Sequence, residues 1–156
     1  MSNGIPKAPN DDYGLVQACR ELHSVIDSFD AIIAQKVSIS RNALRCLNLL
    51  EKEPLLSKQI AEKLGLTSGS VTALQDRLEK RRLIRRKPHP EDRRAILVEL
   101  TPTAHAQLGS LYRMMGESIV LLSDNYGKQK AQNAVHILND LSERFESVIQ
   151  RVEKNP

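Results

Sequence analysis

The fold is decided by residues 57–101, which read SKQIAEKLGLTSGSVTALQDRLEKRRLIRRKPHPEDRRAILVELT. Apolar residues spaced by three and four positions predict a helix at 58–64, capped by Ser57, and a second helix at 67–82, capped by Thr67. Gly65 lies between them and favours a helix stop, because glycine accepts the left-handed backbone at helix ends. Two short helices joined by a glycine-containing turn are typical of a helix-turn-helix.

A basic hairpin is predicted directly after the second helix. Residues 83–87 and 95–100 have strand character, and PHPEDRR at 88–94 is typical of a hairpin tip. Such a hairpin is a wing, which places arginine near the minor groove of DNA, where the negative potential is enhanced. We expect Asp92 to hold the wing by fixing the direction of an arginine, and Arg94 to reach DNA.

Positive charge is concentrated in the same stretch. The chain has a net charge of +4, and nine basic and four acidic residues lie between Asp76 and Arg94. The remainder has 14 basic and 15 acidic residues, so the positive field is one local patch. A polyanion-binding face has this distribution, although a solvated surface is the alternative interpretation of a charge run.

Long amphipathic helices are predicted on both sides of residues 57–101. They cover 11–36, 102–124 and 128–152, and a shorter helix capped by Ser40 precedes the helix-turn-helix. Apolar residues at spacings of three and four are typical of helices that pack along a seam against another helix. The predicted seam residues are Leu15, Cys19, Leu22, Ile26, Phe29 and Ile33 in the first helix, and Ala131, Val135, Leu138, Leu141, Phe145, Val148 and Val152 in the last.

Several classes of protein are disfavoured by composition. The 156 residues contain no apolar run near the roughly 20 residues of a membrane span, and residues 1–10 lack the apolar segment of a signal peptide, so we expect a cytoplasmic protein. Aromatic residues make up 3%, which argues against a base-stacking binder of single strands or RNA. No phosphate loop, nucleophile motif or metal-ligand spacing is present, so we expect no enzyme, cofactor or metal.

Residues 57–101 resemble the MarR family of winged helix-turn-helix regulators. The resemblance rests on IAEKLGL at 60–66, SVT at 70–72 and DRLEK at 76–80, then on PEDRR at 90–94 and VELT at 98–101. The Asp-x-Arg at Asp92 and Arg94, followed by Leu100 and Thr101, is the wing signature of that family. The flanking helices agree with the family in their order and length only.

The resemblance implies a mainly α fold: a winged helix-turn-helix with a two-stranded β wing and long N- and C-terminal dimerisation helices. It also implies a homodimer with intertwined terminal helices that binds a pseudo-palindromic site on double-stranded DNA. The expected organisation is a flexible tail at 1–10, a helical dimerisation region at 11–36 and 102–152, and a DNA-binding domain at 40–101. The predicted seams agree with this, since they require a partner.

The second helix of a helix-turn-helix presents its N-terminal residues to base edges in the major groove. Gln75 could pair with adenine, Arg77 with guanine or phosphate, and Ala73 with a thymine methyl group. The predicted DNA-binding residues are Ser68, Ser70, Thr72, Ala73, Gln75, Asp76 and Arg77 in the helix, and Arg86, Asp92, Arg93 and Arg94 in the wing.

Arg82 departs from the family pattern, which commonly has glycine at this position. If the backbone there is left-handed, arginine costs about 1 kcal/mol relative to glycine. Either the turn differs, or the extra charge acts on phosphate and compensates.

Regulation is less specified by the sequence. The resemblance implies a repressor released by a small, often aromatic, anionic ligand, and Arg20, His23 and Arg45 are the candidate partners of that ligand. Oxidation of Cys19, alone or with Cys46, is an alternative, but a cysteine on an apolar stripe is more often a core residue. A winged-helix protein-interaction module is another alternative, which the basic wing and serine-rich helix start disfavour, because such an interface prefers apolar anchors.

Overall fold

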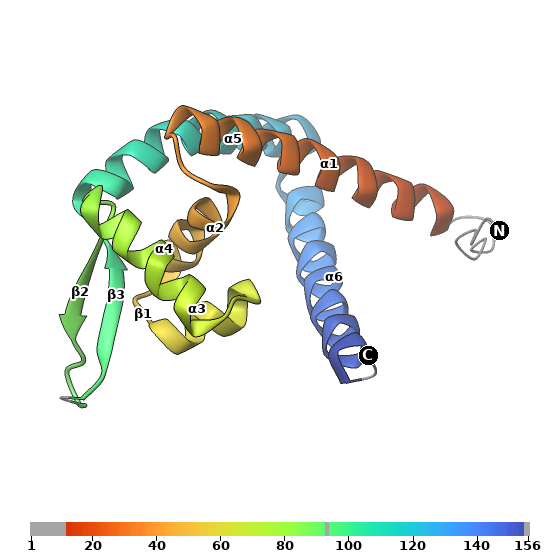
Figure 1. The fold of residues 1–156 in the computed structure, drawn as a ribbon. Helices are drawn as coiled ribbons and strands as arrows, with labels where there is room; N and C mark the ends of the chain where they lie inside the picture. The colour runs from red at the N-terminus through yellow and green to blue at the C-terminus, as the bar shows by residue number, and fades with distance from the viewer. Residues whose placement is uncertain (1–11, 93, 155–156) are drawn as a thin grey trace. The chain divides into compact units, whose positions relative to one another are not determined.

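The computed structural model describes residues 12–92 and 94–154 of the chain (Figure 1). The tail predicted at 1–10 lies outside the described residues. The chain divides into two compact units, Met1–Gln107 and Leu108–Pro156.

The first unit is a winged helix-turn-helix, which confirms the predicted fold class. The helix-turn-helix is formed by α3 and α4, and β2 and β3 form the wing (Figure 1). Strand β1 pairs with the opposite side of β3, so the antiparallel sheet has three strands in the order β1-β3-β2. The elements of this unit are α1 (Asp12–Lys36), α2 (Arg41–Lys52), β1 (Leu55–Leu56), α3 (Ser57–Leu64), α4 (Ser68–Lys80), β2 (Ile84–Pro88), β3 (Ile96–Leu100) and the start of α5 (Pro102–Tyr126).

The helix starts confirm two of the three predicted caps. Ser40 Oγ accepts a hydrogen bond from the Ala43 amide at 3.2 Å, and Thr67 Oγ1 accepts one from the Ser70 amide at 3.3 Å. The prediction for Ser57 is wrong, because Ser57 is the first residue of α3 and Leu56 is the N-cap. The Leu56 amide donates to Gln59 Oε1 at 2.8 Å, so a side chain inside the first turn satisfies the amide of the N-cap residue.

The core of the first unit lies where α2, α3 and α4 meet the sheet. The predicted inward faces of α2 and α4 are buried there, and Cys46 is completely buried among them. Burial raises the pKa of the Cys46 thiol to about 12. The core residues of α2, α3, α4 and the strands are Ala43, Leu44, Cys46, Leu47, Leu50, Leu55, Ile60, Leu64, Val71, Leu74, Leu78, Ile84, Val98 and Leu100.

The end of α4 turns through a left-handed residue. The Arg82 amide donates to the Glu79 carbonyl at 2.8 Å, and the Leu83 amide donates to the Leu78 carbonyl at 3.0 Å. This pair of bonds is a Schellman motif, which requires a left-handed residue after the helix. Arg82 takes that conformation with φ +58°, so of the two alternatives left open by the sequence, a different turn is excluded. Thr101 Oγ1 then donates to the Arg82 carbonyl at 2.7 Å.

The second unit consists of the remainder of α5 and the whole of α6 (Lys128–Lys154). Gly127 lies between the two helices and has a left-handed backbone with φ +84°. Within the described part of α6 no residue is buried in the single chain. The apolar side chains of this unit that are more than two fifths exposed are Met114, Ile119, Val120, Leu121, Leu122, Tyr126, Val135, Ile137, Leu138, Phe145, Val148, Ile149 and Val152. Among the described residues, no helix combines the length and apolarity that crossing a membrane requires.

Candidate nucleic-acid interface

The first turns of α4 present small polar side chains to solvent. Ser68, Ser70, Thr72 and Ala73 are exposed, as the sequence predicted. Thr72 Oγ1 donates to the Ser68 carbonyl at 3.0 Å, and Thr67 Oγ1 donates to Ser70 Oγ at 2.9 Å. These short side chains allow a nucleic-acid surface to approach the free N–H groups at the helix start.

Gln75 corrects the predicted outer face of α4. Its side chain is 1% exposed, and its Oε1 accepts a hydrogen bond from Ser57 Oγ at 3.0 Å. The prediction that Gln75 reaches a base edge is therefore wrong. Four residues after Val71 and three before Leu78, Gln75 lies within the buried stripe and links α4 to the start of α3.

Arg86 and Asp76 also have an internal role. Arg86 Nη2 donates to Asp76 Oδ1 at 2.7 Å, and Nη1 forms a second ion pair with Glu79. The hydrogen bond with Asp76 is the main cause that raises the pKa of Arg86 above its ordinary value, and the charge of Glu79 adds to it. Both carboxylates favour the charged guanidinium. The side chain of Arg86 is only 27% exposed. These ion pairs hold β2 against α4, and the DNA contacts expected of Asp76 and Arg86 stay a prediction.

Two further cations of the wing pair with one carboxylate. Arg85 Nε donates to Glu99 Oε1 at 2.5 Å, and Lys87 Nζ forms an ion pair with Glu99 Oε2. The hydrogen bonds with Lys87 and Arg85 hold the pKa of Glu99 below its ordinary value. Cross-strand pairs of opposite charge stabilise a two-stranded hairpin, so this cluster supports the wing.

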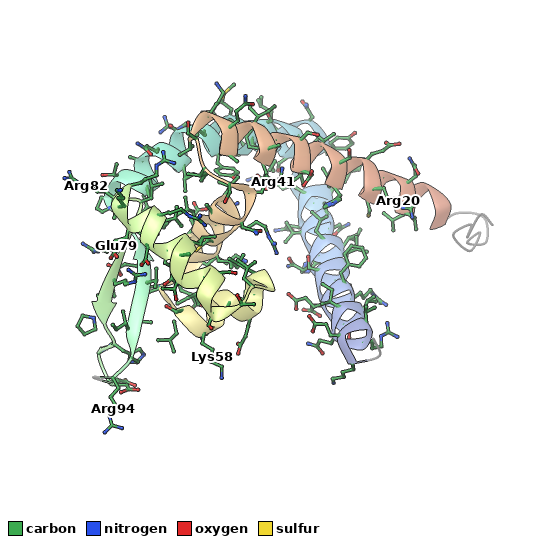
Figure 2. The ribbon with its side chains drawn as sticks, in the orientation of Figure 1. Arg20, Arg41, Lys58, Glu79, Arg82 and Arg94 are labelled. Carbon is green, nitrogen blue, oxygen red and sulfur yellow. The ribbon has the colours of Figure 1, made fainter. Side chains whose placement is uncertain are left out.

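The wing tip is organised by backbone hydrogen bonds. His89 Nδ1 accepts from the amides of Glu91 and Asp92, both at 3.2 Å, and Asp92 Oδ1 accepts from the Arg94 amide at 2.9 Å. Asp92 therefore shapes the tip by accepting from a peptide N–H, and no guanidinium among the described residues, which leave out Arg93, forms an ion pair with it. Arg94 is exposed and points away from the wing (Figure 2). Arg93 lies outside the described residues.

The cations that remain available differ from those predicted. Among the described residues of the basic stretch, the side chains of Arg77, Lys80, Arg82 and Arg94 are exposed and form no ion pair. Lys58, which sequence reasoning missed, is also exposed, and its Nζ lies 3.9 Å from Glu62 Oε1 in a surface ion pair. It points from the start of α3 toward the same lower side of the view as Arg94 (Figure 2). Lys58 is the second residue of α3, the first helix of the helix-turn-helix. That position was the signal for a phosphate contact available in the sequence, because helix N-termini favour phosphate.

The candidate effector residues are all on the surface. Arg20 and His23 are exposed on α1, one turn apart, and Arg45 is exposed on α2. Arg45 Nη1 donates to Asn42 Oδ1 at 3.5 Å, and no hydrogen bond joins the three candidates within the described part of the chain. Cys19 is half-buried, and neither it nor Cys46 is in a disulfide.

The sequence is similar to known regulators. The model of the MarR family matches residues 38–95. YfiV of Bacillus subtilis (strain 168), an uncharacterised HTH-type transcriptional regulator, is 34% identical over 109 residues, which cover 67% of this chain and 68% of YfiV. YcgE of the same organism, described in the same words, is 27% identical over 140 residues, which cover 89% of this chain and 91% of YcgE.

Solved structures share the fold at low sequence identity. A MepR mutant from S. aureus matches with a TM-score of 0.68 at 18% identity, over 86% of this chain and 96% of that one. Another S. aureus MepR mutant, bound to an oligodeoxyribonucleotide, matches with a TM-score of 0.56 at 18% identity, over 86% and 97%. NadR in complex with 4-hydroxyphenylacetate matches with a TM-score of 0.60 at 22% identity, over 90% and 97%.

Proposed function

This chain belongs to the MarR family of winged helix-turn-helix transcriptional regulators, and from that premise we propose that it is a homodimeric repressor that binds a pseudo-palindromic operator. The observation that carries the proposal is the exposed polar start of α4, with the exposed cation Arg77 on the same helix and Arg94 at the wing tip. A small polar helix start fits the major groove, and an arginine at a wing tip fits the adjacent minor groove.

Dimerisation is supported by apolar surface that the single chain leaves open. On α1 the predicted seam residues Leu15, Leu22 and Ile26 are 50%, 51% and 40% exposed, whereas Ile33 is buried. On α6 the seam residues Val135, Leu138, Phe145, Val148 and Val152 are all at least 44% exposed. Apolar surface of this extent marks an interaction site, and a second copy of the chain covers it in the proposed dimer. We assign 11–36 and 102–152 to the dimerisation region and 40–101 to DNA binding.

Fluorescence anisotropy with DNA from upstream of the protein's own gene tests the function. Scrambled DNA of the same length and composition is the control, and both are titrated at several salt concentrations. We expect affinity for both to fall steeply with salt, and the upstream DNA to bind about 10³-fold more tightly at each concentration. Equal affinities at every salt concentration would contradict a sequence-specific regulator and leave the winged unit as a non-specific or protein-binding module.

The contribution of the wing is tested by Arg94→Ala. Removal of the exposed guanidinium should weaken operator binding by about 1–3 kcal/mol without changing the dimer measured by sedimentation. Lys154→Ala, which removes a positive charge from the last turn of α6 outside the proposed dimerisation region, is the matched control and should leave the affinity within about twofold of the wild type. Unchanged binding by Arg94→Ala would remove Arg94 from the interface.

We further propose that a small anionic aromatic effector releases the repressor, through Arg20, His23 and Arg45. The complex of NadR with 4-hydroxyphenylacetate supports this class of ligand. Calorimetric titration of the dimer with 4-hydroxyphenylacetate and with benzoate should detect binding that Arg20→Ala weakens. If neither binds, and peroxide releases DNA from the wild type but not from Cys19→Ser, the cysteine-oxidation alternative replaces this proposal.

A further inference from the structure

The guanidinium of Arg81 joins the ends of two helices. Arg81 Nη1 donates to the Ser38 carbonyl and Nη2 donates to the Val37 carbonyl, both at 2.6 Å. Val37 and Ser38 directly follow α1, and Arg81 directly follows α4. We call these two bonds the Arg81 clamp. It connects the residues that directly follow the proposed dimerisation helix to the residue that directly follows the proposed DNA-reading helix.

The end of α1 is suited to receive a cation. The Ser38 amide donates to Gln35 and the Ile39 amide donates to Ala34, both at 2.9 Å, and Ser38 is left-handed with φ +53°. This turn ends α1, and the Val37 and Ser38 carbonyls accept hydrogen bonds from Arg81. The C-terminus of a helix carries a partial negative charge, so a guanidinium is attracted there.

Two parallel bonds from one guanidinium fix direction as well as distance. A planar fork that donates twice restricts rotation between its partners, and bonds from a charged donor are stronger than neutral ones. Arg41 provides a second attachment along α1, since its Nη1 donates to the Asp27 carbonyl at 2.6 Å and its Nη2 pairs with the Asp27 carboxylate. The winged helix-turn-helix therefore holds α1 at two separate places. Figure 2 shows Arg41 reaching toward α1.

We propose that Arg81 is a positioning residue that sets the angle between α1 and α4, and through it the spacing of the two DNA-reading helices in the dimer. This inference rests on the proposed function. Helix α4 has 13 residues and is about 20 Å long. A rotation of about 10° at the clamp would move the far end of α4 by about 3.4 Å, which is the rise of one base pair. Loss of the clamp should therefore loosen the half-site spacing that the dimer accepts.

A charge-conserving pair of variants isolates this role. Arg81→Lys keeps the positive charge but replaces the fork with a single ammonium group, which cannot make the two parallel bonds. Arg82→Lys makes the same chemical change one residue later, where the side chain is exposed and forms no ion pair within the described residues. Both variants keep the net charge, so the long-range attraction to DNA stays equal between them.

The first measurement uses the upstream DNA with its half-sites located by footprinting. Duplexes with one base pair added or removed between the half-sites are compared with the natural spacing. We expect wild type and Arg82→Lys to lose about tenfold in affinity on either change, and Arg81→Lys to lose less than about threefold. Equal spacing profiles for all three proteins would overturn the inference. So would an Arg81→Lys loss that is the same at every spacing, because that indicates lower stability only.

The second measurement does not depend on DNA. A spin label at Lys63→Cys on α3, in a Cys19→Ser background, reports the distance between the two copies in the dimer, since Cys46 is completely buried. We expect Arg81→Lys to broaden the distance distribution and Arg82→Lys to leave it unchanged. If the wild type fails to distinguish DNA sequences, the proposed function is wrong. The width of the distance distribution then decides the role of Arg81 by itself. An unchanged width then overturns the inference as well.

Discussion

Replacing Arg82 with glycine should stabilise the protein. Arg82 is the left-handed residue of the Schellman motif that ends α4, with φ +58°. Side chains with a Cβ are strained in this conformation, because Cβ approaches the neighbouring carbonyl oxygen, and glycine avoids the contact. The side chain of Arg82 is exposed and forms no ion pair with another described residue, so its removal loses little packing.

The size of the effect follows from two opposing terms. Relief of the left-handed strain stabilises the folded state by about 1–2 kcal/mol. The greater freedom of glycine in the unfolded chain offsets about 0.4–1 kcal/mol of this gain. The midpoints of these ranges leave a net stabilisation of about 0.8 kcal/mol, within limits of about 0–1.6 kcal/mol. The midpoint corresponds to a rise in melting temperature of about 2–3 °C for a chain of this length.

Arg82→Ala is the matched control, since it removes the same guanidinium but keeps a Cβ at the left-handed position. Urea unfolding at one fixed protein concentration should place Arg82→Gly above the wild type, and Arg82→Ala within about 0.5 kcal/mol of it. An Arg82→Gly protein no more stable than Arg82→Ala would refute the strain argument. If the guanidinium contacts phosphate, the two variants should lose equal affinity for DNA.

Three other changes have definite expected outcomes. Thr67→Ala removes the cap of α4 and should lower the free energy of unfolding by about 1 kcal/mol, measured by urea titration. An unchanged urea midpoint would mean that the start of α4 does not depend on the Thr67 hydroxyl. Iodoacetamide at pH 7.5 should alkylate Cys46 only after unfolding, because burial raises the pKa of its thiol to about 12; modification of the native protein, detected by mass spectrometry, would contradict this. Glu99→Gln should lower the free energy of unfolding at pH 7. The difference from the wild type should shrink below about pH 4.5, because the folded state depresses the pKa of Glu99 and the stabilising charge is lost as pH falls. A difference in unfolding free energy that does not change with pH would exclude the ion pairs as the cause.

The elements, their order and most caps could be predicted because they depend on local patterns. The apolar spacing predicted the helices, and Gly65 and Thr67 predicted the turn between α3 and α4. For Arg82 the sequence left a left-handed backbone and a different turn as alternatives, and the structure has the left-handed backbone. Polar residues inside an apolar stripe were harder. With Val71, Leu74 and Leu78 taken as the inward face of α4, Gln75 was expected on or beside the outer face. Its spacing of four residues from Val71 and three from Leu78 places it in the buried face instead.

The destination of the arginines could not be read from the sequence. Arg86 pairs with Asp76 and Glu79, which lie ten and seven residues earlier, on the other side of the turn that ends α4. Arg81 reaches carbonyl groups more than forty residues away. Both depend on where the turn directs the chain, and a cluster of positive residues in the sequence contains no information on which of them acquire internal partners.

This internal use of arginine and lysine has a consequence for how the protein would search a chromosome. Four of the nine basic residues between positions 76 and 94 are bonded within the protein: Arg81, Arg85, Arg86 and Lys87. Each cation withdrawn from phosphate contact reduces the slope of log affinity against log salt by about 0.9. The protein should therefore remain only briefly on sequences that are not its target, moving by frequent dissociation and return and not by long sliding. Occupancy of the operator then depends on contacts made at the site itself.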